Sequence, residues 1–139
     1  MRALVDDASM FAFWLSGIED RPERSGEICV AEIFGSGIRG GHAEVGVGIH
    51  AFRDPSLDEA FSTVTLALDT TIEHDYAVHW SDRDVVFSID DRRIHNVEQS
   101  PDYPMQLMIG VFDFPARRPT AGMQFTPELM VSRVRGGPR

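Results

Sequence analysis

Two glutamates in an apolar segment are the residues of this sequence that could do chemistry. The segment SGEICVAEIFG, residues 25–35, places Glu27 and Glu32 five positions apart among residues suited to burial. Charged side chains are rarely buried in full unless they are paired or functional. Two carboxylates about 5–5.5 Å apart suit hydrolysis of a glycosidic bond with retention of configuration. One would be the nucleophile, and the other the acid that then acts as base.

The conformation of the strand that carries the glutamates decides whether they can act together. In an unbroken strand alternate side chains point to opposite faces, so Glu27 and Glu32 would be separated. A β-bulge near Val30–Ala31 would add one residue and return Glu32 to the face of Glu27. Alternatively, one glutamate faces solvent and the other forms a salt bridge, for instance with Arg24. The spacing alone leaves both interpretations open.

Composition bounds the class of protein. The 139 residues suit one domain, residues 1–139, with one core. A net charge of −9 argues against a nucleic-acid-binding surface, and a single cysteine excludes an internal disulfide and a Cys-based zinc site. No apolar run reaches about 18 residues, so no membrane span is expected. We predict no cofactor and no metal site. The acidic N-terminus lacks the apolar core of a signal peptide, which predicts a cytoplasmic location for the chain as written, or secretion only if its N-terminus is truncated.

The strand-forming segments predict an all-β fold. Short apolar runs recur at roughly 10-residue spacing between Gly, Pro, Asp and Ser, which is typical of an antiparallel β-sandwich. Residues Gly35–Gly41 and Pro115–Pro127 are expected to be loops. The expected strands are Met10–Leu15, Glu27–Phe34, Glu44–His50, Phe61–Leu68, Asp75–Trp80, Asp84–Ile89, Arg93–Val97, Met105–Phe112 and Leu129–Val134.

Several segments, in order along the chain, resemble glycoside hydrolase family 16, the laminarinase and lichenase type. GEICVAE is similar to the family signature Glu–Ile–Asp–x–x–Glu, which lies on a bulged strand of a concanavalin A-like jelly roll. SMFAFWLSG resembles the strand before that signature, GVGIHAF the strand after it, and YPMQLMIGVFDFP a later strand. The resemblance covers roughly residues 8–135. It implies a jelly roll and cleavage of β-linked poly- or oligosaccharides such as laminarin or mixed-linkage glucan.

The resemblance also implies roles for single residues. Glu27 takes the nucleophile position, and Glu32 the acid/base position, which requires a raised pKa. His50 is expected to line the cleft and hydrogen-bond Glu32, with a surface position at the strand end as the alternative. Trp14 and Trp80 could stack on sugar rings, and core packing is the alternative for both. Phe112 and Phe114 could line one end of the cleft, with core packing again as the alternative.

Two departures from the family pattern leave other functions open. The central Asp of the signature is Cys29 here, and a thiol is a weak hydrogen-bond donor. The chain is also shorter than the family domain, which predicts a reduced jelly roll that associates into a homo-oligomer. The alternatives to an enzyme are a lectin-like carbohydrate-binding jelly roll that has lost catalysis, or a structural remnant.

Overall fold

The fold is built almost entirely from antiparallel strands. It is seen in a computed structural model, which describes residues 1–118 and 125–137. Three short 3-10 turns, η1 (Pro22–Arg24), η2 (Gly35–Gly37) and η3 (Pro115–Arg117), join some of the strands. The strands are β1 (Arg2–Leu4), β2 (Ser9–Gly17), β3 (Glu27–Phe34), β4 (Ile38–Arg39), β5 (His42–His50), β6 (Ala60–Ala67), β7 (Tyr76–Trp80), β8 (Val85–Ile89), β9 (Arg92–Val97), β10 (Met105–Asp113) and β11 (Glu128–Met130).

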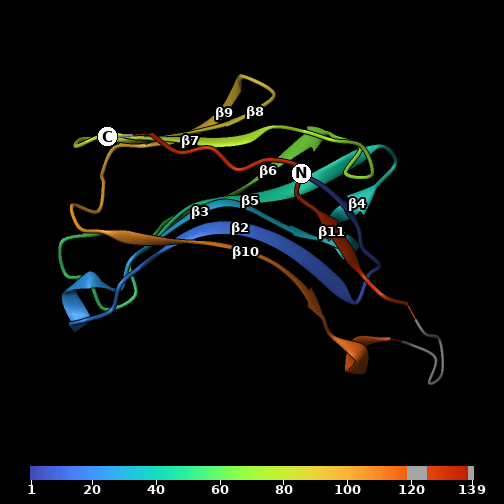
Figure 1. The fold of residues 1–139 in the computed structure, drawn as a ribbon, viewed down its shortest axis with the longest axis horizontal. Helices are drawn as coiled ribbons and strands as arrows, with labels where there is room; N and C mark the ends of the chain where they lie inside the picture. Colours follow the sequence, from blue (N-terminus) through green and yellow to red (C-terminus); the bar gives the residue numbers. More distant parts are fainter. Residues whose placement is uncertain (119–124, 138–139) are drawn as a thin grey trace.

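The strands form one large sheet and two smaller ones. In the large sheet the order is β10-β2-β3-β5, and both β4 and β6 pair with β5. A second sheet has the order β7-β8-β9, and β1 pairs with β11. Figure 1 shows the large sheet as an arch, with the β7-β8-β9 layer over its convex side. Among residues 1–118 and 125–137, no second layer covers the opposite, concave side of the arch.

The core lies between the convex side of the large sheet and the β7-β8-β9 layer. Alternation along β3 and β5 directs Ile28, Ile33, Val45 and Ile49 into this space, where they have no exposed surface. Phe87 of β8 meets them from the second sheet and is equally buried. Burying a side chain of this size contributes about 1.5–3 kcal/mol. Packing on the convex face therefore stabilises the sheet, and the concave face is available to bind a ligand.

The all-β antiparallel fold class predicted from the sequence is confirmed. Each predicted strand has a counterpart, and Glu27–Phe34 has the predicted bounds. The predicted loop at residues 35–41 contains η2 and β4, and β11 ends at Met130 because residues 131–137 form no ladder. The loop expected at Pro115–Pro127 lies partly outside the described residues. Within the described part of the chain, no helix has the length and apolar character to cross a membrane.

Candidate active site

A β-bulge in β3 brings the two glutamates to one face. Along β3, Cys29 pairs with Gly48 of β5, and Glu32 pairs with Gly46. From Cys29 to Glu32 the chain advances three residues along β3 but only two along β5. On the other side, the adjacent residues Phe13 and Trp14 of β2 pair with Ala31 and Cys29, which are two residues apart. The extra residue is Val30, so the register confirms the bulge predicted near Val30–Ala31.

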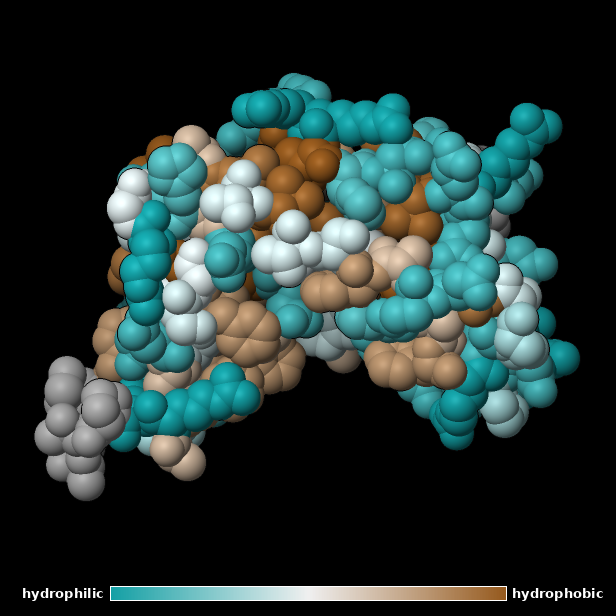
Figure 2. Space-filling model, turned by 180° about the vertical axis from the view of Figure 1, so that it is seen from behind, coloured by the Kyte–Doolittle hydropathy of each residue, from teal (hydrophilic) through white to brown (hydrophobic). Residues whose placement is uncertain are grey.

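Glu27, Cys29 and Glu32 therefore line the concave face together. Both glutamate residues are partly exposed, whereas the residues between Cys29 and Glu32 are buried in the core on the other side. A pocket of about 210 Å³ opens over them. A second pocket, of about 250 Å³, adjoins it and shares Glu32. We call these two adjoining pockets the groove. Figure 2 shows the concave side of the molecule as a hollow between two lobes. The remaining lining residues are Met10, Ala12, Trp14, Phe34, Ser36, Gly37, Glu44, Gly46, Phe61, Thr63 and Phe112.

The alternative interpretation of the glutamates, in which one pairs with Arg24, is wrong. Arg24 forms its salt bridge with Asp20, four residues away, at 3.2 Å. No salt bridge to Glu27 or Glu32 is found within the described residues. Both carboxylates are thus free of a structural ion pair, which leaves them available to a ligand in the groove.

The environment of Glu27 shifts its acidity. Burial raises the pKa of Glu27 above its ordinary value, and the negative charges of Glu19 and Glu32 add to this effect. The charge of His50 and a hydrogen bond from Ser16 act in the opposite direction. Burial is the largest of these influences, so the net effect is a raised pKa for Glu27, which His50 and Ser16 partly oppose.

Cys29 lies between the glutamates as a neutral group. Burial raises the pKa of its thiol, and the carboxylates of Glu32 and Glu27 raise it further, so the thiol stays protonated. Its Sγ lies 3.9 Å from the carbonyl oxygen of Gly46, to which it can donate a weak hydrogen bond. The side chain is 3% exposed, which makes it a small apolar filler of the groove floor.

Aromatic side chains border the glutamates on the β2 and β10 side. Trp14 pairs with Cys29 across the β2–β3 ladder and so lies on the same face. Its ring centroid is 6.0 Å from that of Phe112 of β10, and Phe112 is 39% exposed. Beyond them Phe114 stacks on Phe34 at 6.4 Å. These rings provide apolar surface beside two carboxylates, which is the combination of groups that a sugar ring requires.

Comparisons with known proteins identify the family of this chain. The family model for glycosyl hydrolases family 16 matches residues 5–125. The chain belongs to glycosyl hydrolases family 16. A comparison with curated proteins found no match.

Two solved structures share the family 16 fold with this chain. One is a GlcNAcα1-4Gal-releasing endo-β-galactosidase from Clostridium perfringens, with 23% identity and a TM-score of 0.64 over 79% of this chain. The other is the family 16 protein of a Bacteroides ovatus mixed-linkage glucan locus in complex with its product, with 19% identity and a TM-score of 0.54 over 80% of this chain. The present chain spans 30% and 52% of the lengths of those two chains.

The His50 contact expected from the family 16 resemblance is not the one observed. His50 pairs with Glu27 in the β3–β5 register, not with Glu32. Its Nδ1 lies 2.6 Å from a carboxylate oxygen of Glu59, and that carboxylate also accepts a hydrogen bond from the Ala51 amide. The imidazole stacks on Phe61 with 4.4 Å between centroids. The expectation was wrong because the imidazole of His50 instead contacts Glu59, which lies outside the segments that resemble the family.

Trp80 is not brought to the family 16 groove. It lies at the end of β7 in the second sheet, and its indole Nε1 donates to Ser100 Oγ at 2.7 Å and to the Pro101 carbonyl at 3.0 Å. The ring packs against the core. The alternative interpretation of Trp80, core packing, is the correct one.

One supporting residue of the family 16 groove was missed by the sequence analysis. The hydroxyl of Tyr103 accepts a hydrogen bond from the Gly26 amide at 2.9 Å and donates to Asp54 at 2.7 Å. Gly26 immediately precedes Glu27, so Tyr103 anchors the start of β3. The contact spans 77 residues of sequence, and no local signal points to it.

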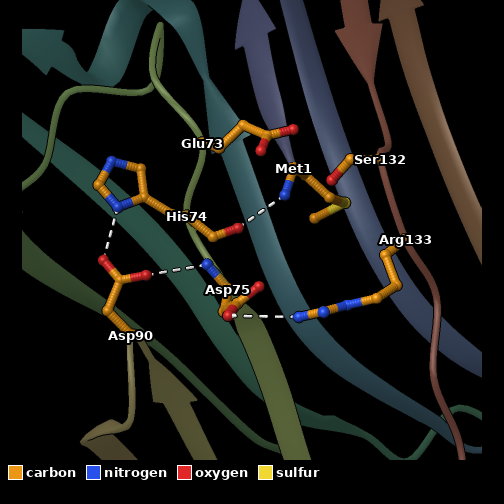
Figure 3. Close-up of a pocket in the computed structure, with 7 residues that line it drawn as sticks. All are labelled: Met1, Glu73, His74, Asp75, Asp90, Ser132 and Arg133. Carbon is orange, nitrogen blue, oxygen red and sulfur yellow. Dashed lines mark hydrogen bonds and ion pairs between the residues drawn. The ribbon is translucent and has the colours of Figure 1, made fainter.

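A polar pocket of about 500 Å³ lies away from the groove, and Figure 3 shows its residues. His74 is held there by Asp90, at 2.6 Å from Nδ1, and by the Asp69 carbonyl, at 2.9 Å from Nε2. Arg133 lies 3.9 Å from Asp75. Both ring nitrogens of His74 are thus engaged in structural contacts. Among the residues that the structure describes, no group of three or more His, Cys, Asp or Glu is arranged to hold a metal ion.

Proposed function

We propose that this protein is a retaining glycoside hydrolase that acts on β-linked poly- or oligosaccharides. Glu27 is the nucleophile and Glu32 the acid/base. The observation that carries the proposal is the bulge at Val30, which directs the side chains of Glu27 and Glu32 into the same groove. Neither glutamate forms an ion pair within the described residues. The two structural relatives support this class of substrate, since one is an endo-β-galactosidase and the other is a mixed-linkage glucan locus protein in complex with its product.

The reaction proceeds in two displacements. Glu27 attacks the anomeric carbon while Glu32 gives its proton to the glycosidic oxygen, so that the C–O bond breaks and the leaving sugar departs as an alcohol. Glu32, now a carboxylate, takes a proton from water, and the resulting oxygen attacks the anomeric carbon and releases Glu27. Trp14 and Phe112 offer flat apolar faces to sugar rings on one side of the glutamates. His50 and Ser16 favour the ionised form of Glu27 that the attack requires.

The test is release of reducing sugar from a panel of β-glucans and β-galactans, with NMR observation of the anomeric configuration of the first product. We expect a β product, and loss of release in both Glu27→Gln and Glu32→Gln. Glu73→Gln is the matched control, because Glu73 lies in the remote polar pocket. Activity of Glu27→Gln near that of the unaltered protein, or an inverted first product, would refute the mechanism.

A carbohydrate-binding module without catalysis is the second candidate, and Cys29 favours it. The thiol bonds the backbone of Gly46 and offers no strong hydrogen bond to either glutamate. In that case the same panel would show binding without release, and Cys29→Asp would restore some release. Association into a homo-oligomer is a separate proposal that applies to either candidate, and it is tested by light scattering of the purified protein.

A further inference from the structure

The charged side chains of the groove all have the same sign. Its two pockets contain the carboxylates of Glu27, Glu32 and Glu44, and no arginine or histidine lines either pocket. Glu44 is exposed and has no salt bridge among the described residues. The polar groups that remain are uncharged, namely Ser36 and Thr63.

The arginines near the groove are engaged elsewhere. Arg39 bonds Asp7 at 3.0 Å, and Arg53 bonds Glu19 at 3.2 Å. Arg118 is held between Asp6 and Asp113. Arg117 lies over the Phe114 ring at 4.4 Å, beyond Phe34 at one end of the groove. His50, which stacks on the groove residue Phe61, faces the carboxylate of Glu59.

Recognition of a sulfate or a uronate requires cationic side chains or a cluster of N–H groups aimed at the anion. Proteins bind such anions with guanidinium groups, ammonium groups or clusters of backbone N–H groups, because the anion must exchange its water for donors of opposite charge. In this groove an anionic substituent would instead meet the carboxylates of Glu27 and Glu44 and the carboxyl group of Glu32. We propose that the groove selects neutral glycans and excludes sulfated or uronate-bearing ones. This inference rests on the proposed function, and it names the substrate class of the same site.

The size of the discrimination follows from Coulomb's law. An anionic substituent at roughly 6–8 Å from a carboxylate is repelled by it, in a medium between protein surface and water. This repulsion raises the dissociation constant of the glycan that carries the substituent by about tenfold. Because the groove is open to solvent, salt screens this repulsion. The difference between neutral and anionic glycans should therefore shrink as the salt concentration rises.

The experiment compares binding of matched polymers that differ only in charge. The probes are laminarin and chemically sulfated laminarin, and agarose oligosaccharides and the same oligosaccharides after chemical sulfation. Binding is measured by titration calorimetry in about 0.05 M and 0.5 M salt, with reducing-sugar release recorded in parallel. We expect one neutral member to bind, its sulfated partner to bind at least about tenfold more weakly at low salt, and the gap to narrow at high salt.

Variants of Glu44 and Glu73 separate the effect of charge in the groove from the effect of the protein's net charge. Glu44→Arg should strengthen binding of the sulfated member more than Glu44→Gln does, whereas Glu73→Gln, which changes the net charge equally to Glu44→Gln, should leave the ratio unchanged. Sulfated glycan bound as tightly as its neutral partner would overturn the inference and leave the proposed function standing. Folded protein that binds no neutral glycan would overturn both.

Discussion

Tyr103 is expected to hold the proposed nucleophile, Glu27, in place, and the effect of removing its hydroxyl can be predicted in detail. The change Tyr103→Phe deletes one hydroxyl and leaves the ring. That hydroxyl is shared by the Gly26 amide, 2.9 Å away, and Asp54, 2.7 Å away. Tyr103 is 5% exposed and Asp54 4% exposed, so water does not replace the lost oxygen readily. Both partners lose a contact in a buried site.

The magnitude follows from the two partners. A buried N–H left without an acceptor costs about 1–3 kcal/mol. Asp54 keeps two hydrogen bonds, from the amide and the hydroxyl of Ser56, so its own loss is smaller. Together we expect the free energy of unfolding to fall by about 3 kcal/mol. For a chain of this size this corresponds to a fall in Tm of about 10 °C. Because Gly26 precedes Glu27, turnover should also fall by about tenfold.

Tyr76 supplies the matched control. It is also buried, yet its hydroxyl finds no hydrogen-bond partner within the described residues. Tyr76→Phe removes an unsatisfied polar group and keeps the edge-on contact of the ring with Phe11. We expect its Tm to stay unchanged or to rise. Urea and thermal unfolding of both variants decide the matter, and a Tyr103→Phe protein as stable as Tyr76→Phe would refute the reasoning.

Three further predictions concern the same face of the sheet and its support. Gly48→Ala should lower the free energy of unfolding by about 2–4 kcal/mol in urea unfolding, because φ is +136° and the new Cβ would lie 2.2 Å from the Ala60 carbonyl oxygen. Gly40→Ala is the control, since φ is +58° with open space around it, and it should lower the free energy of unfolding by only about 1 kcal/mol. Burial acts to raise the pKa of Asp54, but hydrogen bonds from Ser56 and Tyr103 outweigh it and hold this pKa below its ordinary value, so its contribution to stability is present at neutral pH and is lost as the pH falls below about 4. That acid-dependent loss, measured by thermal unfolding from pH 3 to pH 7, should be smaller in Tyr103→Phe. Cys29→Asp should move the alkaline limb of the pH–rate profile to higher pH, because a third carboxylate raises the pKa of its neighbours, whereas an alkaline limb that coincides with that of Cys29→Ser would contradict this.

The predictable parts of this structure are those that depend on neighbours in sequence. The bounds of Glu27–Phe34 follow from its apolar run between Gly26 and Gly35. The spacing of the two glutamates left the bulge undecided, and the resemblance of GEICVAE to a signature on a bulged strand predicted it. The sheet to which a strand belongs depends on distant partners, so Trp80 could not be separated from the groove by pattern alone. The partner of His50 was misjudged for the same reason, since Glu59 lies on the adjoining loop and competes for the ring.

Small residues on both sides of Glu32 define where the groove crosses the sheet. In the register, Gly110 pairs with Ala12, Ala12 with Glu32, and Glu32 with Gly46. This row carries almost no side-chain volume apart from the carboxylate. The neighbouring row contains Met108 paired with Trp14, and a further row pairs Phe112 with Met10.

The register therefore gives the groove two walls and a floor. A glycan that crosses the strands along the row of Glu32 would have aromatic and methionine side chains on either side of it. On the β5 side the missing side chain of Gly46 leaves room for the ring of Phe61, since a Cβ there would lie 2.5 Å from its Cζ. Phe61 in turn stacks on His50, which acts on the charge of Glu27. Gly46 thus opens the floor beside Glu32 and also leaves room for the ring that stacks on His50, the histidine paired with Glu27.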